Sequence, residues 1–417
     1  MALPRFDVVV LGAGIIGVSA ALHLQARGRS VAIVDRRGAP ARETSYGNSG
    51  IIQAEAIFPY MFPRSIREIA IAAFNRDPRA QIRYSAMPAI APFVWRYFLA
   101  SSPARRIASA KAARPLIARA VPEHRALAVA AGSEALLSEG GWIKAFRTEQ
   151  GRQAALAEIE EARPFGVAAR LLDRQALLAL EPNLSQAAIG GVHFTDPLTT
   201  PDPGALVNAY AELFLKGGGR LLAGDARTLD ASGDAFSVAT VQGQLVAREA
   251  IVALGAWSND IFRPLGYRFP LGVKRGYHMH YGAQGGAVLT RPVNDAEFGY
   301  VLAPMTRGIR LTTGAEFARR DDLPSSAHLD RLEPLARALF PLAERKDPAP
   351  WLGQRPCLPD MLPIIGPADR HKGLWFDFGH HHLGLTLGPI SGRLIAELLT
   401  GEPPSVDPSP FSGARFG

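Results

Sequence analysis

The chain is poor in features that define several classes of protein. Its 417 residues include one cysteine, Cys357, so an intrachain disulfide is excluded and a reducing compartment fits. No apolar run approaches the roughly 18 residues that span a bilayer. Glycines interrupt the run from Val8 to Ile16, which argues against a signal peptide. We therefore expect a cytoplasmic protein, or one that is peripheral on the inner face of the membrane.

Basic residues are numerous but are not gathered in one block. The formal net charge is +8, while Arg pairs such as Arg36-Arg37, Arg105-Arg106 and Arg319-Arg320 lie far apart in the sequence. Nucleic-acid-binding proteins more often present a basic stripe with interleaved aromatic residues. We expect no nucleic-acid partner, and an Arg-rich surface that favours anionic substrates or an anionic membrane.

A glycine-rich turn follows the first predicted strand. The β-branched run at residues 6–11 leads into a Gly-Ala-Gly-Ile-Ile-Gly turn, a helical pattern, and a second strand at 30–34. In such a βαβ unit the first glycine allows the tight turn, the second lets a pyrophosphate approach the backbone, and the third lets the helix pack on the strand. The free amides at the helix start hold phosphates, and a carboxylate after the second strand binds ribose hydroxyls.

This βαβ unit predicts a dinucleotide site and leaves NAD and FAD open. The expected contacts are Gly12, Gly14, Ile15, Ile16, Gly17, Asp35 and Arg36.

Three later segments carry a resemblance to a known family. They are Glu43 to Gly50 (ETSYGNSG), Ala250 to Ser258 (AIVALGAWS), and a C-terminal block from Gly353 (GQRP) to Pro389 (GHHHLGLTLGP). In this order they resemble the D-amino acid oxidase superfamily of FAD-dependent amine oxidoreductases, and the resemblance covers nearly the whole chain. Residues 43–50 are similar to the bacterial D-amino acid dehydrogenase branch in particular.

The resemblance implies an α/β fold in two parts. It implies a Rossmann-like FAD-binding domain at residues 1–56, 187–268 and 345–417. A second, α+β substrate domain at 57–186 and 269–344 would place an antiparallel or mixed sheet over the flavin.

The resemblance also implies FAD as the cofactor. Monomeric sarcosine oxidases attach FAD to a cysteine several residues upstream of the position of Cys357, so we expect noncovalent FAD. The further FAD contacts implied are Ser45, Asn48, Ser49, Gly50, Ala226, Gly255, Trp257, Gly379, Gly384, Leu385 and Thr386.

The C-terminal block suggests a helix. We expect Pro389 at its N-terminus, where the missing N–H costs nothing, and Gly401 at its end. By resemblance, the amides of residues 384–386 face the flavin. His381 and His382 stand where relatives have a glycine and a small residue. Adjacent histidines project in different directions and no Cys or carboxylate cluster accompanies them, so we expect no metal site.

The rest of the chain is expected to form the substrate domain. Residues 57–170 read as largely helical with breaks at prolines such as Pro92, Pro115 and Pro122, and residues 269–317 read as strands. The proline-rich tail after Gly401 is expected to be poorly ordered.

Arg355 is the first candidate substrate residue, because a guanidinium binds a carboxylate through two parallel hydrogen bonds. By resemblance, the Arg of this Gly-x-Arg-Pro step holds the substrate carboxylate in D-amino acid and glycine oxidases; a structural Arg paired with a buried acid is the alternative. Tyr300 has roughly the position of their carboxylate-binding Tyr. Tyr277 follows Gly276, which suggests close approach of a ligand or another backbone. His380 completes the candidate catalytic set.

The resulting hypothesis is oxidation of the Cα–N bond of a D-amino acid by hydride transfer to flavin N5. The imine is then hydrolysed to a keto acid and ammonia. The alternatives are a glycine-, sarcosine- or hydroxyproline-oxidising flavoenzyme, a flavin-binding subunit inactive alone, and an NAD-dependent dehydrogenase.

The electron acceptor is left open between oxygen and a carrier. Residues 43–50 favour a dehydrogenase that passes electrons to a quinone or another electron-transfer partner. The apolar stretch 92–99, followed by Arg105 and Arg106, would suit an anionic membrane surface. A buried core helix is the alternative for this stretch.

Overall fold

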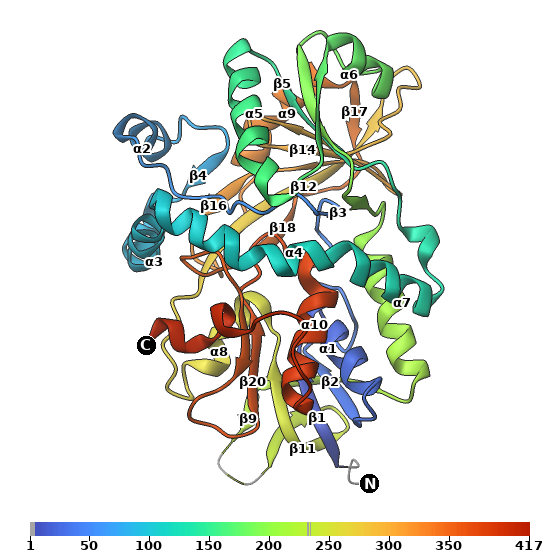
Figure 1. Cartoon of the computed structure of the whole chain (residues 1–417), viewed down its shortest axis with the longest axis vertical. Helices are drawn as coiled ribbons and strands as arrows, with labels where there is room; N and C mark the ends of the chain where they lie inside the picture. Colours follow the sequence, from blue (N-terminus) through green and yellow to red (C-terminus); the bar gives the residue numbers. More distant parts are fainter. Residues whose placement is uncertain (1–4, 232, 234) are drawn as a thin grey trace.

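The computed structural model describes residues 5–231, 233 and 235–417. Two sheets lie one above the other along the longest axis of the molecule, and the long helix α4 (Pro103–Ala131) crosses between them (Figure 1). The fold is therefore of the mixed α/β class.

The first sheet has seven strands. Its β1 (Phe6–Leu11) lies between β2 (Val31–Asp35) and β11 (Gly243–Val252), and both pair with it in parallel. The β1 and β2 sequences are almost continuously apolar because both faces of these strands are buried. The sheet is completed by β9 (Arg220–Asp230) beside β2, β10 (Phe236–Thr240) between β9 and β11, β20 (Leu374–Phe378) beside β11, and the edge strand β19 (Ile364–Pro367).

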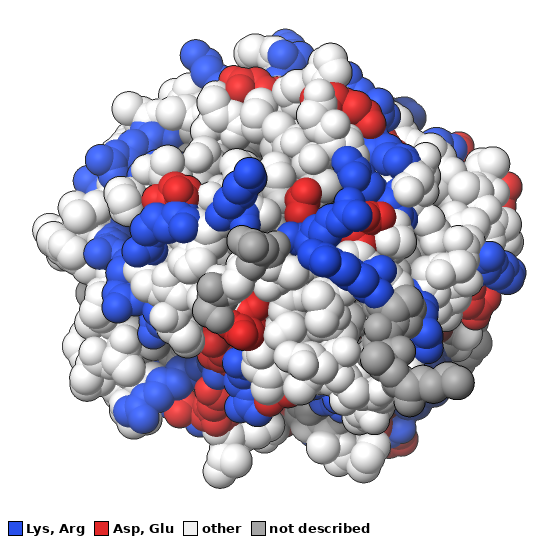
Figure 2. Space-filling model, turned by 90° about the horizontal axis from the view of Figure 1, so that it is seen from below, with Lys and Arg blue, Asp and Glu red and all other residues white. Residues whose placement is uncertain are grey.

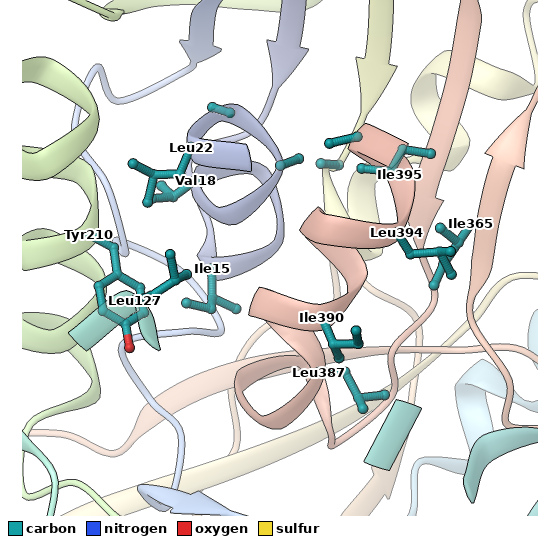
Figure 3. Packing of buried hydrophobic residues seen from close by; sticks show 14 of the residues in the cluster. Ile15, Val18, Leu22, Leu127, Tyr210, Ile365, Leu387, Ile390, Leu394 and Ile395 are labelled. Atoms are coloured by element: carbon teal, nitrogen blue, oxygen red, sulfur yellow. The ribbon is translucent and has the colours of Figure 1, made fainter. Parts of the chain in front are cut away.

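Three helices cover one face of this sheet: α1 (Ile15–Gln25), α7 (Pro203–Lys216) and α10 (Gly384–Thr400). Figure 3 shows α1 and α10 side by side, with Val18 and Leu22 of α1 directed towards the side of Tyr210 in α7 and Leu394 of α10 next to Ile365. A Cβ at position 392 would lie 2.5 Å from the backbone nitrogen of Ala20, so the glycine there lets the two helices approach closely. This packing holds the start of α10 beside the glycine turn that precedes α1.

The second sheet has eleven strands and is built around β12 (Gly272–Ala283). This strand pairs antiparallel with β15 (Gly308–Thr312), β16 (Ala315–Phe317), β17 (Leu342–Arg345) and β18 (Trp351–Cys357). The remaining strands are β4 (Ala80–Ile82), β5 (Trp142–Phe146), β6 (Ala169–Asp173), β7 (Gly190–Phe194), β13 (Val293–Asp295) and β14 (Val301–Met305).

The helices of the second part are α2 (Ile66–Ala73), α3 (Met87–Ala100), α5 (Glu149–Ala162), α6 (Arg174–Leu180) and α9 (Ala327–Leu339). The short α8 (Asn259–Phe262) belongs to the first part, and a two-stranded pair, β3 (Ile51–Ile52) with β8 (Leu198–Thr199), lies between the sheets.

The structure differs from the expected segmentation in several places. Strands β7 and β18 belong to the second sheet, although the expected boundaries gave them to the FAD-binding domain, because an apolar run does not reveal which sheet it pairs with. Residues 57–170, expected to be largely helical, also contain β4, β5 and the start of β6. Pro92, Pro115 and Pro122 lie inside α3 and α4 instead of ending them.

The C-terminal tail is ordered, against expectation. Phe411 is fully buried, the amide of Ser405 donates to Glu397 Oε2 at 2.7 Å, and Arg415 donates to Asp360 Oδ2 at 2.8 Å. The proline-rich composition wrongly predicted a poorly ordered tail, because it does not reveal that the tail packs against the first part of the molecule.

Candidate active site

A cavity of about 1610 Å³ lies between the two sheets. Its walls include the turn after β1, the carboxyl end of β2, the turn after β11, the start of α10 and the face of β12 and β18. Typical small-ligand sites measure roughly 300–1,000 Å³. The cavity therefore has room for a dinucleotide together with a small substrate.

The glycines after β1 have different reasons to be glycine. Gly12 has φ +108, and a Cβ there would lie 2.6 Å from the carbonyl oxygen of Ala253; a Cβ at Gly17 would lie 2.0 Å from the carbonyl oxygen of Gly12. Gly14 lines the cavity, and its Cβ would meet only Ser45 Oγ, at 3.4 Å. Gly12 and Gly17 are therefore required by the fold itself, whereas Gly14 leaves open space towards the cavity.

The two ends of this βαβ unit are tied together by hydrogen bonds. Asp35 Oδ2 accepts from the amide of Ala13 at 3.1 Å, and Asp35 Oδ1 accepts from the amide of Arg37 at 2.8 Å. The amide of Ile15 donates to Ser45 Oγ at 3.1 Å. Asp35, Ile15, Ile16 and Ser45 all line the cavity.

Arg36 extends this wall by lying over the Trp257 ring, with its guanidinium carbon 4.3 Å from the ring centroid. Ala226 and Gly255 line the same end of the cavity. The structure thus brings together contacts that the sequence places more than 200 residues apart.

Some of residues 43–50 line the cavity, and others are required by the backbone conformation of this turn. Asn48 and Ser49 line the cavity. Gly50 does not; it has φ +76, and a Cβ there would lie 2.2 Å from the carbonyl oxygen of Thr200. Asn48 Oδ1 accepts from the amide of Gly50 at 2.9 Å, which shapes the turn.

The helix α10 begins at Gly384, five residues before Pro389, so the expected position of Pro389 at the helix start is wrong. An interior proline leaves the carbonyl four residues earlier without its donor, here that of Leu385. His124 of α4 supplies the donor, with its Nε2 2.7 Å from the Leu385 oxygen. Because a carbonyl only accepts, Nε2 carries the proton.

The start of α10 faces the cavity through Gly384 and Leu385. Thr386 is buried instead, and its Oγ1 accepts from the amide of Gln53 at 3.1 Å. Gly379 also lies outside the cavity wall; it has φ +91, and a Cβ there would lie 2.7 Å from Leu358 Cδ1.

His380 is part of a buried polar chain on the cavity wall. Its Nε2 lies 2.9 Å from Ser391 Oγ, which donates to Asp377 Oδ1 at 2.6 Å. Desolvation lowers the pKa of His380 to about 3 and raises the pKa of Asp377 to about 8. Both groups are therefore uncharged near neutral pH.

The other two histidines of this block pack on each other. His381 has φ +42, a left-handed conformation that favours glycine, and its Nδ1 lies 2.9 Å from Nδ1 of His382. Within the described ranges, no group of three or more His, Cys, Asp or Glu residues is placed to hold a metal ion.

Arg355 lies in the part of the cavity wall that β12 and β18 form. Its Nη1 donates to the carbonyl of Gly314 at 2.8 Å, and its Nη2 donates to the carbonyl of Thr313 at 3.1 Å. A Cβ at Gly276 would lie 2.4 Å from Nη2, so the close approach that Gly276 indicated is that of Arg355. Burial lowers the pKa of this guanidinium.

The two candidate tyrosines are not directed at the cavity with Arg355. The Tyr300 hydroxyl donates to the carbonyl of Leu335 at 3.2 Å and accepts from Arg147 at 2.8 Å; its side chain is fully buried and absent from the cavity wall. Tyr277 borders the cavity, but its hydroxyl donates to Glu316 Oε2 at 2.7 Å. Alternation along β12 puts the Tyr277 side chain on the face opposite Gly276, over which Arg355 lies.

Several wall residues near Arg355 were not anticipated. They are Lys274, Tyr97, Tyr60 and His382. Tyr60 stacks at a tilt on His382 with ring centroids 4.8 Å apart. Lys274 could have been found, because it shares the β12 face with Gly276, two residues away; the tyrosines come from distant loops and helices.

The sequence matches the model of the FAD dependent oxidoreductase family over residues 7–398. The chain belongs to this family. It is 31% identical to a D-amino-acid oxidase of Bradyrhizobium diazoefficiens, over 98% of each chain. It is 30% identical to a D-amino acid dehydrogenase of Chromohalobacter salexigens, over 98% of this chain and 99% of the relative.

The fold is similar to the crystal structure of glycine oxidase from Geobacillus kaustophilus. The TM-score is 0.75 at 22% identity, over 98% of each chain. The protein is thus an FAD-dependent oxidoreductase, as the resemblance implied.

The residues present fit an FAD molecule. Gly14 and Gly384 both line the cavity, and a Cβ at either position would meet no protein atom closer than 3.4 Å. The space they leave open therefore serves a ligand and not protein packing. Asp35 lines the cavity at the carboxyl end of β2, where a carboxylate would bind ribose hydroxyls, and the amides at the start of α10 would be available to the cofactor.

Proposed function

We propose that the protein oxidises the Cα–N bond of D-amino acids and that Arg355 binds the substrate carboxylate. The observation that carries this proposal is the environment of Arg355. Its guanidinium is held by two backbone carbonyls and lines the cavity without a carboxylate partner in the described part of the chain. A planar guanidinium in this setting favours a carboxylate ligand.

The protein residues then have defined tasks. The glycine turn, Asp35 and the start of α10 would hold the cofactor, and the β12–β18 face would supply the substrate-binding wall of the cavity. When bound, FAD supplies the two-electron oxidant. Arg355 orients the substrate so that the Cα–H faces the cofactor. His380 and His382 are uncharged near neutral pH, so they place no further positive charge beside the substrate amine.

The test is a panel of D- and L-amino acids, glycine, sarcosine and hydroxyproline added anaerobically to the purified yellow protein. We expect D-amino acids to bleach the flavin absorbance. We expect R355M to lower kcat/KM by roughly 10²–10³-fold, the size of losing a charged hydrogen-bonded pair, while flavin content stays unchanged. A flavin that no amine bleaches would refute the activity. Faster bleaching by glycine or sarcosine than by any D-amino acid would favour a glycine- or sarcosine-oxidising flavoenzyme.

We further propose that electrons leave to a lipid-soluble carrier at an anionic membrane surface. The outer faces of α2 and α3 expose Ile66, Phe74, Trp95 and Leu99, at 86%, 71%, 61% and 45%. Val94 and Tyr97 of α3 line the cavity, so this helix has one face on the site and another on solvent. Within the ranges described, no helix combines the length and apolar character needed to cross a bilayer.

Charge on the opposite end of the molecule is dispersed. Figure 2 shows the face seen from below, where Lys and Arg patches alternate with acidic and uncharged residues. The membrane proposal therefore depends on the α2–α3 surface alone. Co-sedimentation with vesicles containing anionic lipid should be lost in W95S/L99S and retained in wild type; equal sedimentation of both proteins would refute it.

A further inference from the structure

The cavity wall contains two cations that are neither exposed to solvent nor paired with a carboxylate of the described chain. Five other basic residues of the wall each form an ion pair: Arg36 with Glu43, Arg79 with Asp77, Lys144 with Glu158, Arg227 with Asp225, and Arg320 with Asp260. Arg42 is exposed to solvent. Lys274 and Arg355 are the two that remain.

Lys274 is 7% exposed. Its Nζ lies 3.7 Å from the centroid of the Tyr97 ring, and the second nearest ring is that of Phe317, at 5.8 Å. A cation–π contact compensates only part of the hydration that a buried ammonium loses. The charge on Lys274 therefore calls for an anion that the protein itself does not provide.

Lys274 and Arg355 are partners across the β12–β18 ladder, so they share one face of the sheet. Their charged ends diverge along it. The guanidinium of Arg355 lies over Gly276. The ammonium of Lys274 lies over Tyr97, which stacks on Phe93, and Phe93 covers Gly272 at the other end of this stretch.

Two cations that lean in opposite directions provide two anion sites rather than one shared site. We propose that the substrate is an amino acid with a second carboxylate, of the aspartate or glutamate type, whose α-carboxylate binds Arg355 and whose side-chain carboxylate binds Lys274. This inference rests on the proposed function and names its substrate class. A substrate that reacts as a neutral amine with two carboxylates carries the two negative charges that balance the two cations.

The neighbouring groups support this charge balance. After desolvation, the positive charges of Arg355 and Lys274 are the causes that lower the pKa of His382, to about 3. His381 is lowered in the same direction, by desolvation first and with Lys274 among its further causes. Both histidines are neutral, so they add no cation and leave the two charges for the ligand.

The test compares substrates that differ in charge at nearly equal size. D-glutamate against D-glutamine, and D-aspartate against D-asparagine, are assayed by anaerobic flavin reduction with the FAD-loaded protein. We expect kcat/KM for the acid to exceed that for the amide at least about tenfold. We expect K274M to reduce this ratio to about one, and K274R to retain most of it.

R42Q is the matched control, because it removes one positive charge from the same cavity wall at an exposed position. Its acid-to-amide ratio should equal that of wild type. A wild-type ratio near one, or a K274M variant that loses D-glutamate and D-glutamine activity by the same factor, would overturn the proposal and assign Lys274 a packing role.

A binding measurement separates this inference from the activity. Glutarate and butyrate are titrated against the flavin spectrum of wild type and K274M. Tighter binding of glutarate that disappears in K274M supports the two-carboxylate site even if no amino acid reduces the flavin. Equal binding of the two acids by wild type refutes it.

Discussion

Replacing His124 with leucine tests how the fold holds the cavity wall at the start of α10. In the native protein His124 Nε2 donates to the Leu385 carbonyl at 2.7 Å. Pro389 has no N–H with which to donate to this carbonyl. The site is fully buried. Desolvation lowers the pKa of His124 to about 4, so the neutral imidazole makes this bond throughout the neutral range.

In the H124L variant an apolar side chain of similar volume replaces the imidazole, and the Leu385 carbonyl is left without a donor. Such a loss costs about 1–3 kcal/mol of unfolding free energy. With an unfolding entropy that scales with chain length, this corresponds to a drop in Tm of roughly 1–3 °C. Since Leu385 lines the cavity, we also expect the Kd for FAD to rise, by up to about tenfold.

The assay is a double-mutant cycle of His124 and Pro389, read by thermal unfolding and by FAD titration. In P389A the alanine N–H at 389 can donate to Leu385 within the helix. We therefore expect H124L/P389A to recover most of the stability lost in H124L, a coupling of about 1 kcal/mol or more. H124Q, which retains a donor, should stay near wild type. An H124L loss that P389A does not relieve would refute the reasoning.

Three further results are expected. G14A should fold with a Tm close to that of the wild-type apoprotein, because its Cβ meets only Ser45 Oγ at 3.4 Å, yet bind FAD at least about tenfold more weakly in a titration. Y300F should leave kcat/KM within about twofold, since the Tyr300 side chain is buried away from the cavity, and should lose roughly 1–2 kcal/mol of unfolding free energy; a large loss of kcat/KM would restore its predicted substrate role. Acid should destabilise the protein between pH 6.5 and 4 in denaturant titrations. Six histidines have pKa values lowered to about 4 or below when folded, so only the unfolded chain takes up their protons in this window, while Asp377, whose folded pKa is raised to about 8, opposes one of them. Each proton that the unfolded chain binds in excess corresponds to about 1.4 kcal/mol per pH unit, and a flat profile would contradict this expectation; the histidines are His23, His124, His278, His328, His380 and His382.

The nucleotide-binding half could be predicted because its signals are local. Gly12, Gly17 and Asp35 follow short strands at fixed spacing. Gly12 has φ +108, a Cβ at Gly17 would meet the carbonyl oxygen of Gly12, and Asp35 accepts from the amide of Ala13, so each need arises within the same βαβ unit. The family resemblance added FAD and the C-terminal block. The same resemblance singled out Arg355, through the Gly-x-Arg-Pro step that begins the C-terminal block.

The substrate half depends on contacts between distant segments, which local patterns do not contain. Tyr300 sits on a predicted strand, but only the pairing with Arg147 and Leu335 shows that its hydroxyl faces away from the cavity. Pro389 reads as a helix start until His124, far earlier in the chain, is seen to replace its missing donor.

The sequence by itself determined the cofactor motif, which follows from backbone sterics within one βαβ unit, and the family resemblance pointed to Arg355. Only the tertiary structure decided which charges stay unpaired. Lys274 and Lys144 are both lysines on strands of the second sheet, yet Glu158 neutralises Lys144 and only an aromatic ring covers Lys274. Charge compensation is a property of three-dimensional neighbours, and it is this property that defines what the cavity can bind.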